Sequence, residues 1–143
     1  MIHPERWRWC EAAAAARADG FDQLLDLTAV DYLTYNADRQ LPAEVAPERF
    51  EVVAALISHQ RGERLRMRAQ VPADDPTVAT LFDLWPGAES LEREVYDMFG
   101  IVFEGHPDGS RILMPEDWSG HPLRKDYDTG RIPVQFKAAS NVR

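Results

Sequence analysis

The order of apolar and polar positions predicts both helices and strands in the first hundred residues. Residues 5–18 are rich in alanine, the best helix former, and Gly20 follows them as a stop signal. Residues 23–33 and 49–59 are apolar runs of strand length. The second of them is apolar on both faces from Val52 on, which is typical of a central strand. The prolines between the two runs predict a long loop over residues 34–48.

Residues 64–71 show strict alternation, the pattern of a strand with one covered face. We expect one set of side chains to point inward and the other outward: Leu65, Met67, Ala69 and Val71 against Arg64, Arg66, Arg68 and Gln70. The arginine row is either a solvated face that balances nearby acids or a contact surface for an anionic partner.

Two further helices are expected in the second half of the chain. Asp75 can cap a helix over residues 77–84, where apolar residues recur at helical spacing. A helix over residues 89–99 ends at Gly100, and Glu89–Arg93 and Arg93–Asp97 form favourable i,i+4 pairs within it. Three tryptophans that fall on helical patterns are assigned to the core: Trp7, Trp9 and Trp85.

The composition changes after residue 103, where glycine and proline recur and the apolar residues follow no sustained period. Such a stretch cannot form a core by itself and is ordered only against another surface. The sequence therefore predicts an α+β fold with a mainly antiparallel sheet and packed helices over residues 1–103. An extended, irregular docking segment is expected over residues 104–143.

Charge and composition exclude several classes of function. The 143-residue chain carries a formal charge of −8, which disfavours nucleic-acid binding. Residues 1–110 hold 10 Lys/Arg and 20 Asp/Glu, whereas residues 111–143 hold 6 Lys/Arg and 4 Asp/Glu. The C-terminal part is therefore basic and the rest of the chain is acidic. The longest apolar run, Val52 to Ile57, is too short to insert into a membrane, and the single Cys10 allows no internal disulfide. A cytoplasmic protein is expected.

The sequence lacks the glycine-rich phosphate loops of nucleotide-binding proteins, and one cysteine cannot ligate an iron–sulfur cluster. Two Gly-His-Pro tripeptides remain, around His106 and His121. Together with Asp108 or Asp117 they form a candidate two-histidine, one-carboxylate metal site or a general base with its orienting acid. The other interpretation is that each imidazole braces its own turn or reaches a partner.

Two nearly continuous stretches carry a family resemblance. Residues 91–108 read LEREVYDMFGIVFEGHPD and residues 111–127 read RILMPEDWSGHPLRKDY. Both resemble the signature of the thirty-kilodalton subunit of respiratory complex I, known in bacteria as the C subunit of NADH:quinone oxidoreductase. Weaker landmarks at residues 31–35 and 48–50 extend the resemblance over most of the chain.

The resemblance implies a hydrophilic α+β subunit of the peripheral arm, on the cytoplasmic face of a bacterial membrane. Such subunits bind no cofactor. They pack against the quinone-site subunit of the forty-nine-kilodalton type and its cluster-bearing neighbour, and the C-terminal segment extends over that partner. NADH, FMN, quinone and iron–sulfur clusters then belong to the partner subunits of a proton-pumping complex. One alternative is the equivalent subunit of a membrane-bound hydrogenase or of a dehydrogenase with another donor. Another is a free-standing metal-dependent enzyme that uses His106, His121 and Asp117.

We expect the partner interface to use nine residues of the C-terminal segment: His106, Asp108, Arg111, Trp118, His121, Arg124, Lys125, Asp126 and Tyr127. Trp118 and Tyr127 are either interface anchors or part of a satellite core. The sequence departs from the family at Gly109-Ser110, where Leu-Arg is usual, and at Asp128, where proline is common. The first departure removes one apolar anchor and one charge.

Overall fold

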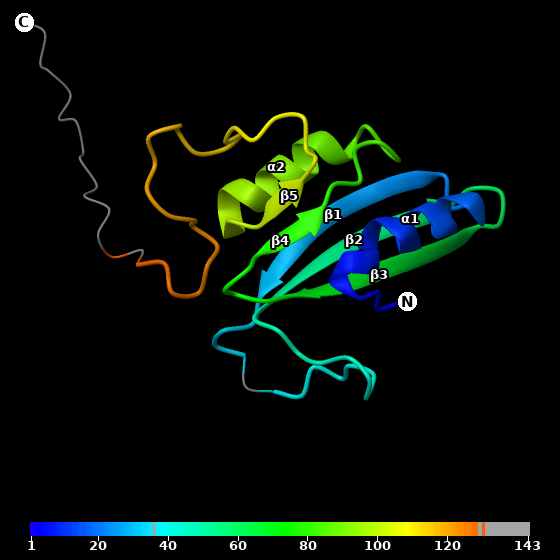
Figure 1. Cartoon of the computed structure of the whole chain (residues 1–143), viewed down its shortest axis with the longest axis horizontal. Coiled ribbons are helices and arrows are strands. Elements are labelled where there is room, and N and C mark those ends of the chain that lie inside the picture. The colour runs from blue at the N-terminus through cyan, green and yellow to red at the C-terminus, as the bar shows by residue number, and fades with distance from the viewer. Residues whose placement is uncertain (36, 129, 131–143) are drawn as a thin grey trace, which may run out of the picture.

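A three-stranded antiparallel sheet forms the centre of the molecule (Figure 1). The structure is a computed structural model that describes residues 1–35, 37–128 and 130. Strand β1 (Gln23–Asp31) pairs with β2 (Phe50–Ser58), and β2 pairs with β3 (Glu63–Val71). All three predicted strands are confirmed, with β2 in the centre.

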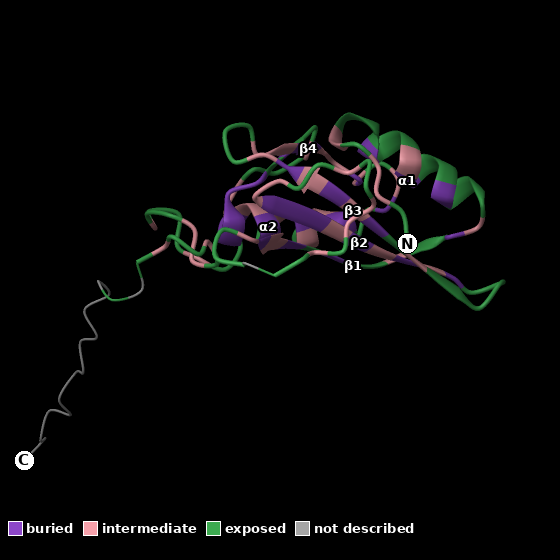
Figure 2. Ribbon diagram, turned by 90° about the horizontal axis from the view of Figure 1, so that it is seen from below, coloured by how far each residue is buried: buried purple, intermediate pink, exposed green. Residues whose placement is uncertain are grey.

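One face of the central strand β2 is fully covered. Phe50, Val52, Ala54 and Leu56 of β2 point to this face, and each has no exposed surface. Helix α1 (Trp9–Ala18), preceded by the 3-10 turn η1 (Arg6–Arg8), lies across it and buries Trp9 completely. The inward alternation predicted for residues 64–71 is confirmed, although Leu65 is only half-buried. Figure 2 shows α1 on one side of the sheet, with buried residues concentrated between these layers.

Helix α2 (Ala88–Phe99) packs along β1 and confirms the helix predicted over residues 89–99. Val95, Met98 and Phe99 of α2 are buried in the same core. With 12 residues it is far shorter than the roughly 20 residues needed to span a bilayer. Within the described ranges, no helix is long and apolar enough to cross a membrane.

The helix predicted over residues 77–84 is wrong. Residues Thr77–Ala79 form strand β4, which pairs in parallel with β5 (Val102–Glu104). Arg6 donates to the Thr77 carbonyl at 3.1 Å, and the buried Glu92 carboxylate accepts the Leu81 N–H at 2.7 Å. These distant partners take the backbone groups that a helix would have paired locally, so tertiary contacts override the helical spacing.

The assignment of all three tryptophans to the core is wrong for Trp7, whose surface is 78% exposed. Trp9 and Trp85 are buried, at 0% and 6% exposure. Residues two positions apart point to different sides of a helix, so Trp7 and Trp9 cannot both face the sheet. Trp85 lies outside a helix, and its indole N–H donates to the Asp22 carbonyl at 3.0 Å.

Residues 105–128 contain neither helix nor strand, which fits the irregular segment predicted there. It runs over the end of α2, at one extremity of the molecule (Figure 1). The predicted boundary between residues 103 and 104 falls within β5. Residues 131–143 of the predicted docking segment lie outside the described residues.

Candidate docking site at the C-terminal end of α2

Helix α2 ends at Gly100, and the following residues bind the carbonyl groups of its last turn. Gly100 adopts a φ of 71°, the left-handed conformation that closes many helices. The last carbonyls of a helix have no partner inside it. Here the C-terminal segment (residues 105–127) supplies the donors, namely Arg111 and His121 to Asp97 O, the Leu123 N–H to Met98 O, and Arg124 to Phe99 O. Two guanidinium groups therefore lie at the negative end of the helix dipole, where cations are favoured.

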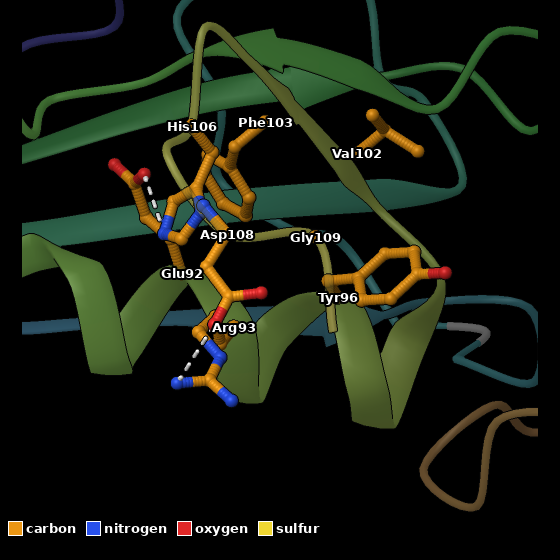
Figure 3. Close-up of a pocket in the computed structure, with 8 residues that line it drawn as sticks. All are labelled: Glu92, Arg93, Tyr96, Val102, Phe103, His106, Asp108 and Gly109. Atoms are coloured by element: carbon orange, nitrogen blue, oxygen red, sulfur yellow. Dashed lines mark hydrogen bonds and ion pairs between the residues drawn. The ribbon is translucent and has the colours of Figure 1, made fainter. Parts of the chain in front are cut away.

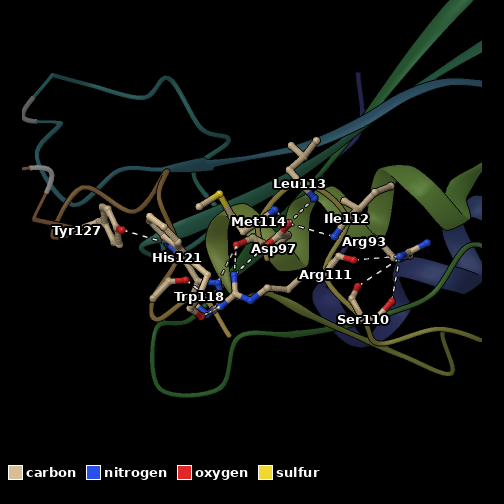
Figure 4. Close-up of polar contacts among 11 residues, drawn as sticks. Arg93, Asp97, Ser110, Arg111, Ile112, Leu113, Met114, Trp118, His121 and Tyr127 are labelled. Carbon is tan, nitrogen blue, oxygen red and sulfur yellow. Dashed lines mark hydrogen bonds and ion pairs between the residues drawn. The ribbon is translucent and has the colours of Figure 1, made fainter. Parts of the chain in front are cut away.

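The buried carboxylate of Asp97 organises the first turn of this segment (Figure 4). Its Oδ2 accepts the backbone N–H groups of Ile112, Leu113 and Met114 at 3.1, 2.7 and 2.8 Å. Its Oδ1 accepts Arg111 Nη1 at 2.7 Å. Burial alone would raise the pKa of Asp97, but these donors outweigh it and hold the pKa below its usual range. The carboxylate thus fixes the backbone direction of residues 111–114.

Arg111 also closes the loop that follows. Its Nη2 donates to the carbonyls of Trp118 and Gly120, both at 3.0 Å. The Trp118 indole N–H donates to the Tyr127 hydroxyl at 3.1 Å, and both aromatic side chains are half-buried. A Cβ atom on Gly120, whose φ is 86°, would lie 2.9 Å from the Tyr127 ring, so this close approach requires glycine.

A second ion-pair cluster ties the segment to the sheet. Asp31, at the end of β1, accepts Arg49 Nη2 at 2.8 Å and the Lys125 N–H at 2.8 Å. Arg49 Nη2 also contacts Asp126 at 2.7 Å. Desolvation opposes ionisation of the buried Asp31, yet the donors from Arg49, Lys125 and Leu33 lower its pKa below the ordinary value. The segment is therefore anchored to two elements of the domain.

His106 lies at the other end of α2, beside a cavity of about 240 Å³ (Figure 3). Its Nδ1 accepts the Asp108 N–H at 3.0 Å, so Nε2 carries the hydrogen and donates to the Glu89 carbonyl at 3.0 Å. Glu92 lies 3.9 Å from that Nε2. Burial raises the pKa of Glu92, although bonds from the Leu81 N–H and the Thr80 hydroxyl favour its ionised form.

Of the pair Gly109-Ser110, the first residue borders this cavity and the second binds Arg93, which also lines it. Gly109 lines it, and a Cβ atom there would meet nothing within 4 Å. The Ser110 hydroxyl accepts a hydrogen bond from Arg93 Nη2 at 3.0 Å, and the Ser110 carbonyl accepts one from Arg93 Nε at 3.3 Å. Arg93 pairs with Glu89 at 3.0 Å as predicted, but the predicted Arg93–Asp97 pair is wrong because Asp97 binds Arg111 instead.

The hypothesis of a shared two-histidine site does not fit this geometry. His106 and His121 bind the carbonyls of Glu89 and Asp97, which lie about two turns apart on α2. At 1.5 Å per residue, those carbonyls are separated by about 12 Å along the helix axis, too far for both imidazoles to reach one ion. Among the described residues, no group of three or more histidine, cysteine, aspartate or glutamate side chains is placed to hold a metal.

The nine predicted interface residues are brought together along the C-terminal segment, and each forms at least one bond within the chain. His106, Arg111, His121 and Arg124 bind carbonyl groups of α2, and Trp118 binds Tyr127. Asp108 and Asp126 pair with Arg93 and Arg49, while Lys125 contributes only its backbone N–H. Large apolar side chains of the same segment remain exposed instead: Ile112 at 40%, Leu113 at 61% and Leu123 at 49%.

Sequence reasoning missed the two buried carboxylates, Glu92 and Asp97, which organise both ends of this arrangement. Glu92 stands on the same helical stripe as the buried Ala88 and Val95, at i+4 from one and i−3 from the other. An acid on the apolar stripe of a helix signals a buried acceptor, because an unpaired charge there would be costly. Asp97 gives a weaker signal, since its donors come from residues 111–114.

The fold and the site define a class of protein: a small α+β domain that braces an irregular segment across one helix end. The chain belongs to the family described as the respiratory-chain NADH dehydrogenase 30 kDa subunit, whose model matches residues 2–132. It is 50% identical over 137 residues to NADH-quinone oxidoreductase subunit 5 of Thermus thermophilus, covering 92% of this chain and 63% of that protein. The NADH-quinone oxidoreductase C subunit of Acidothermus cellulolyticus is 42% identical, over 97% of this chain and 69% of its own length.

Solved structures agree with this assignment. A trypsin-resistant fragment of Nqo5 is 47% identical and superimposes with a TM-score of 0.66, covering 74% of this chain and 79% of that one. A chain of an archaeal membrane-bound sulfane sulfur reductase superimposes with a TM-score of 0.67 at 23% identity, which shows the fold alone. The chain spans less than two thirds of the length of the Thermus relative, so its partners and activity are matters of proposal.

Proposed function

We propose that this chain is a non-catalytic structural subunit in the peripheral arm of a proton-pumping NADH:quinone oxidoreductase. One observation carries the proposal: the C-terminal segment is fixed by buried polar bonds, yet it presents Ile112, Leu113 and Leu123 to solvent. A segment that leaves its large apolar side chains exposed gains little from its own domain. Such an arrangement is typical of a surface that becomes buried against another protein.

The physical advantage of this arrangement is pre-organisation. Binding normally costs free energy because loops and side chains lose freedom at the interface. Here Asp97 and Arg111 already hold the backbone of residues 111–114 before any partner arrives. The nine polar and aromatic interface residues then position the segment. Ile112, Leu113 and Leu123, which lie between them in the chain, make the contact. Half-buried Trp118 and Arg124 are of the residue types that often dominate interface energy.

Membership in the family supports an assignment of the partners. We assign the contact to the quinone-site subunit of the forty-nine-kilodalton type and its cluster-bearing neighbour, which would carry electrons from NADH through FMN and iron–sulfur clusters to quinone. This chain contributes support and no cofactor of its own. It would lie on the cytoplasmic face of a bacterial membrane, held there by other subunits without inserting and without binding nucleic acid.

Affinity purification tests the proposal. The full-length chain with a C-terminal tag replaces the native copy in its host, and detergent-solubilised complexes are isolated and identified by mass spectrometry. The proposal expects stoichiometric recovery of the quinone-site and cluster-bearing subunits together with NADH:quinone reductase activity. Recovery with a hydrogenase or another donor module would replace the assigned complex, and recovery of the chain alone would refute the proposal.

A further inference from the structure

The central strand β2 is apolar on both faces, but the described part of the chain fully covers only one of them. On the covered face, Val52 and Ala54 have no exposed surface. On the opposite face, Val53, Ala55 and Ile57 are only half-buried. Antiparallel sheets with one solvated face usually carry polar residues on that face. An apolar stripe on the outer face of a central strand therefore indicates a second layer that residues 1–35, 37–128 and 130 do not supply.

The strand register places unpaired positive charge beside the stripe. Arg66 lies opposite Ala55, and Arg64 lies opposite Ile57, both on the outer face of β3. Arg68, in the same row, is neutralised by Glu51 at 2.8 Å. The guanidinium groups of Arg64 and Arg66 are exposed and have no ion pair or hydrogen bond within the described residues. In a chain with 24 acidic residues, two unpaired arginines at an apolar stripe favour an acidic partner surface.

This face is separate from the C-terminal segment. Arg124 of the segment lies over the ring of Phe50, a residue of the covered face, at 5.3 Å. Lys125 binds Asp31, which aligns with Phe50 in the sheet and shares its face. Figure 2 shows α1 and β4 together on one side of the sheet. A protein with two such surfaces can contact two neighbours at once.

We propose that the outer face of the sheet, formed by Val53, Ala55, Ile57, Arg64 and Arg66, is a second docking surface for another protein chain. The partner presents an apolar patch to the stripe and aspartate or glutamate side chains to Arg64 and Arg66. The chain's own charge of −8 disfavours a nucleic acid in this place. The proposal rests on the proposed function only for the identity of the partner, not for the existence of the surface.

The experiment compares charge reversal on this face with charge reversal elsewhere. The double variant Arg64→Glu/Arg66→Glu and the control Arg17→Glu, on the exposed side of α1, replace the native chain in its host. Native extracts are separated by size, and the fraction of chain in the large assembly is measured, together with the melting temperature of each isolated chain. We expect at least a tenfold loss of assembled chain for the double variant, no loss for the control, and melting temperatures within about 2 °C of wild type.

The outcomes separate the two proposals. Normal assembly of the double variant would overturn the second docking surface and leave the proposed function intact. If the wild-type chain assembles with proteins other than oxidoreductase subunits and the double variant is missing from that assembly, the proposed function alone is defeated. A self-associating wild-type chain whose double variant is monomeric would identify a second copy as the occupant and contradict the proposal. If the melting temperature falls for the double variant and not for the Arg17→Glu control, Arg64 and Arg66 stabilise the fold, and the docking proposal is overturned.

Discussion

Arg111 binds Asp97 twice, through the carboxylate at 2.7 Å and through the backbone carbonyl at 3.3 Å. The pair joins a helix residue to an irregular segment that follows β5 in the chain. Asp97 has no exposed surface and satisfies three backbone N–H groups besides the guanidinium. This single carboxylate therefore holds residues 111–114 of the irregular segment against the end of α2.

Asp97→Asn should destabilise the domain by about 3 kcal/mol, because it leaves a partly buried guanidinium without its counter-charge. The amide NH₂ would also face backbone N–H groups that need an acceptor. Urea unfolding of the isolated chain measures the loss, and limited proteolysis within residues 105–127 reports the loosening. A variant with wild-type stability and proteolysis would show that the carboxylate does not organise the segment.

The same carboxylate determines an acid dependence. The folded-state pKa of Asp97 lies below its unfolded value, so its contribution is present above the unfolded value of about 3.9 and is lost as pH falls through the folded pKa. Wild type should therefore lose stability as pH falls below about 4, and part of this loss should be absent from Asp97→Asn. Parallel acid unfolding curves for variant and wild type would argue against this assignment.

Glu92→Gln should have the opposite pH dependence. Burial raises the folded-state pKa of Glu92 above its unfolded value of about 4.3. Its contribution is thus fully present below that unfolded value and is lost as pH rises through the folded pKa. The melting temperature of the variant relative to wild type should increase from about pH 4 to about pH 7. A difference that stays constant or decreases over this range would disprove the sign.

Gly100→Ala and Gly62→Ala separate backbone strain from crowding. Both glycines have positive φ, 71° and 65°. The backbone strain alone should therefore make alanine cost about 1 kcal/mol of stability at either site. Only at Gly100 would the new Cβ lie 2.6 Å from the His121 ring and 2.7 Å from Arg124. We expect Gly100→Ala to cost at least twice as much in denaturant unfolding and to displace His121. Equal losses at the two positions would mean that the segment adapts freely to the added methyl group.

Gly109→Leu should stabilise the domain by about 1 kcal/mol or more, because it reduces the freedom of the unfolded chain and places apolar atoms in the cavity beside Val102 and Phe103. Gly109→Ala is the matched control, because it has the first effect without filling the cavity. Thermal unfolding should rank leucine above alanine and alanine above glycine. A leucine variant no more stable than the alanine variant would show that the cavity does not accept the side chain.

The sequence correctly predicted the elements that depend on neighbouring residues. It failed for the element whose conformation depends on residues distant in the chain. The alternation in β3 and the helix ending at Gly100 depend on neighbours within a few positions, and both are confirmed. Strand β4 depends on pairing with β5, from which the whole of α2 separates it in the chain, and on Glu92 holding the Leu81 N–H. Local spacing therefore favoured a helix that the tertiary structure excludes.

For the site, the sequence predicted which segment needs a surface but not which of its side chains point inward. The glycine and proline content of residues 104–143 indicated that the segment needs a surface, and the structure places residues 105–127 on the end of α2. Its polar residues were expected to face a partner, but most of them bind the chain's own carbonyl and carboxylate groups. Side-chain direction in an irregular segment follows no period, so the sequence could not separate inward donors such as Arg111 from exposed side chains such as Leu113.

Assembly of Leu113→Ser into the oxidoreductase tests the central claim most directly. Leu113 is 61% exposed and Trp7 is 78% exposed, so Trp7→Ser is the control for an exposed apolar residue outside the segment. Burying a leucine in a partner is worth about 1.5–3 kcal/mol, so the variant should bind roughly ten- to a hundredfold more weakly. The measurement is the fraction of each tagged chain recovered with the quinone-site subunit, beside its melting temperature. The account predicts a large loss for Leu113→Ser at an unchanged melting temperature and full assembly for Trp7→Ser. Full assembly of Leu113→Ser would contradict it.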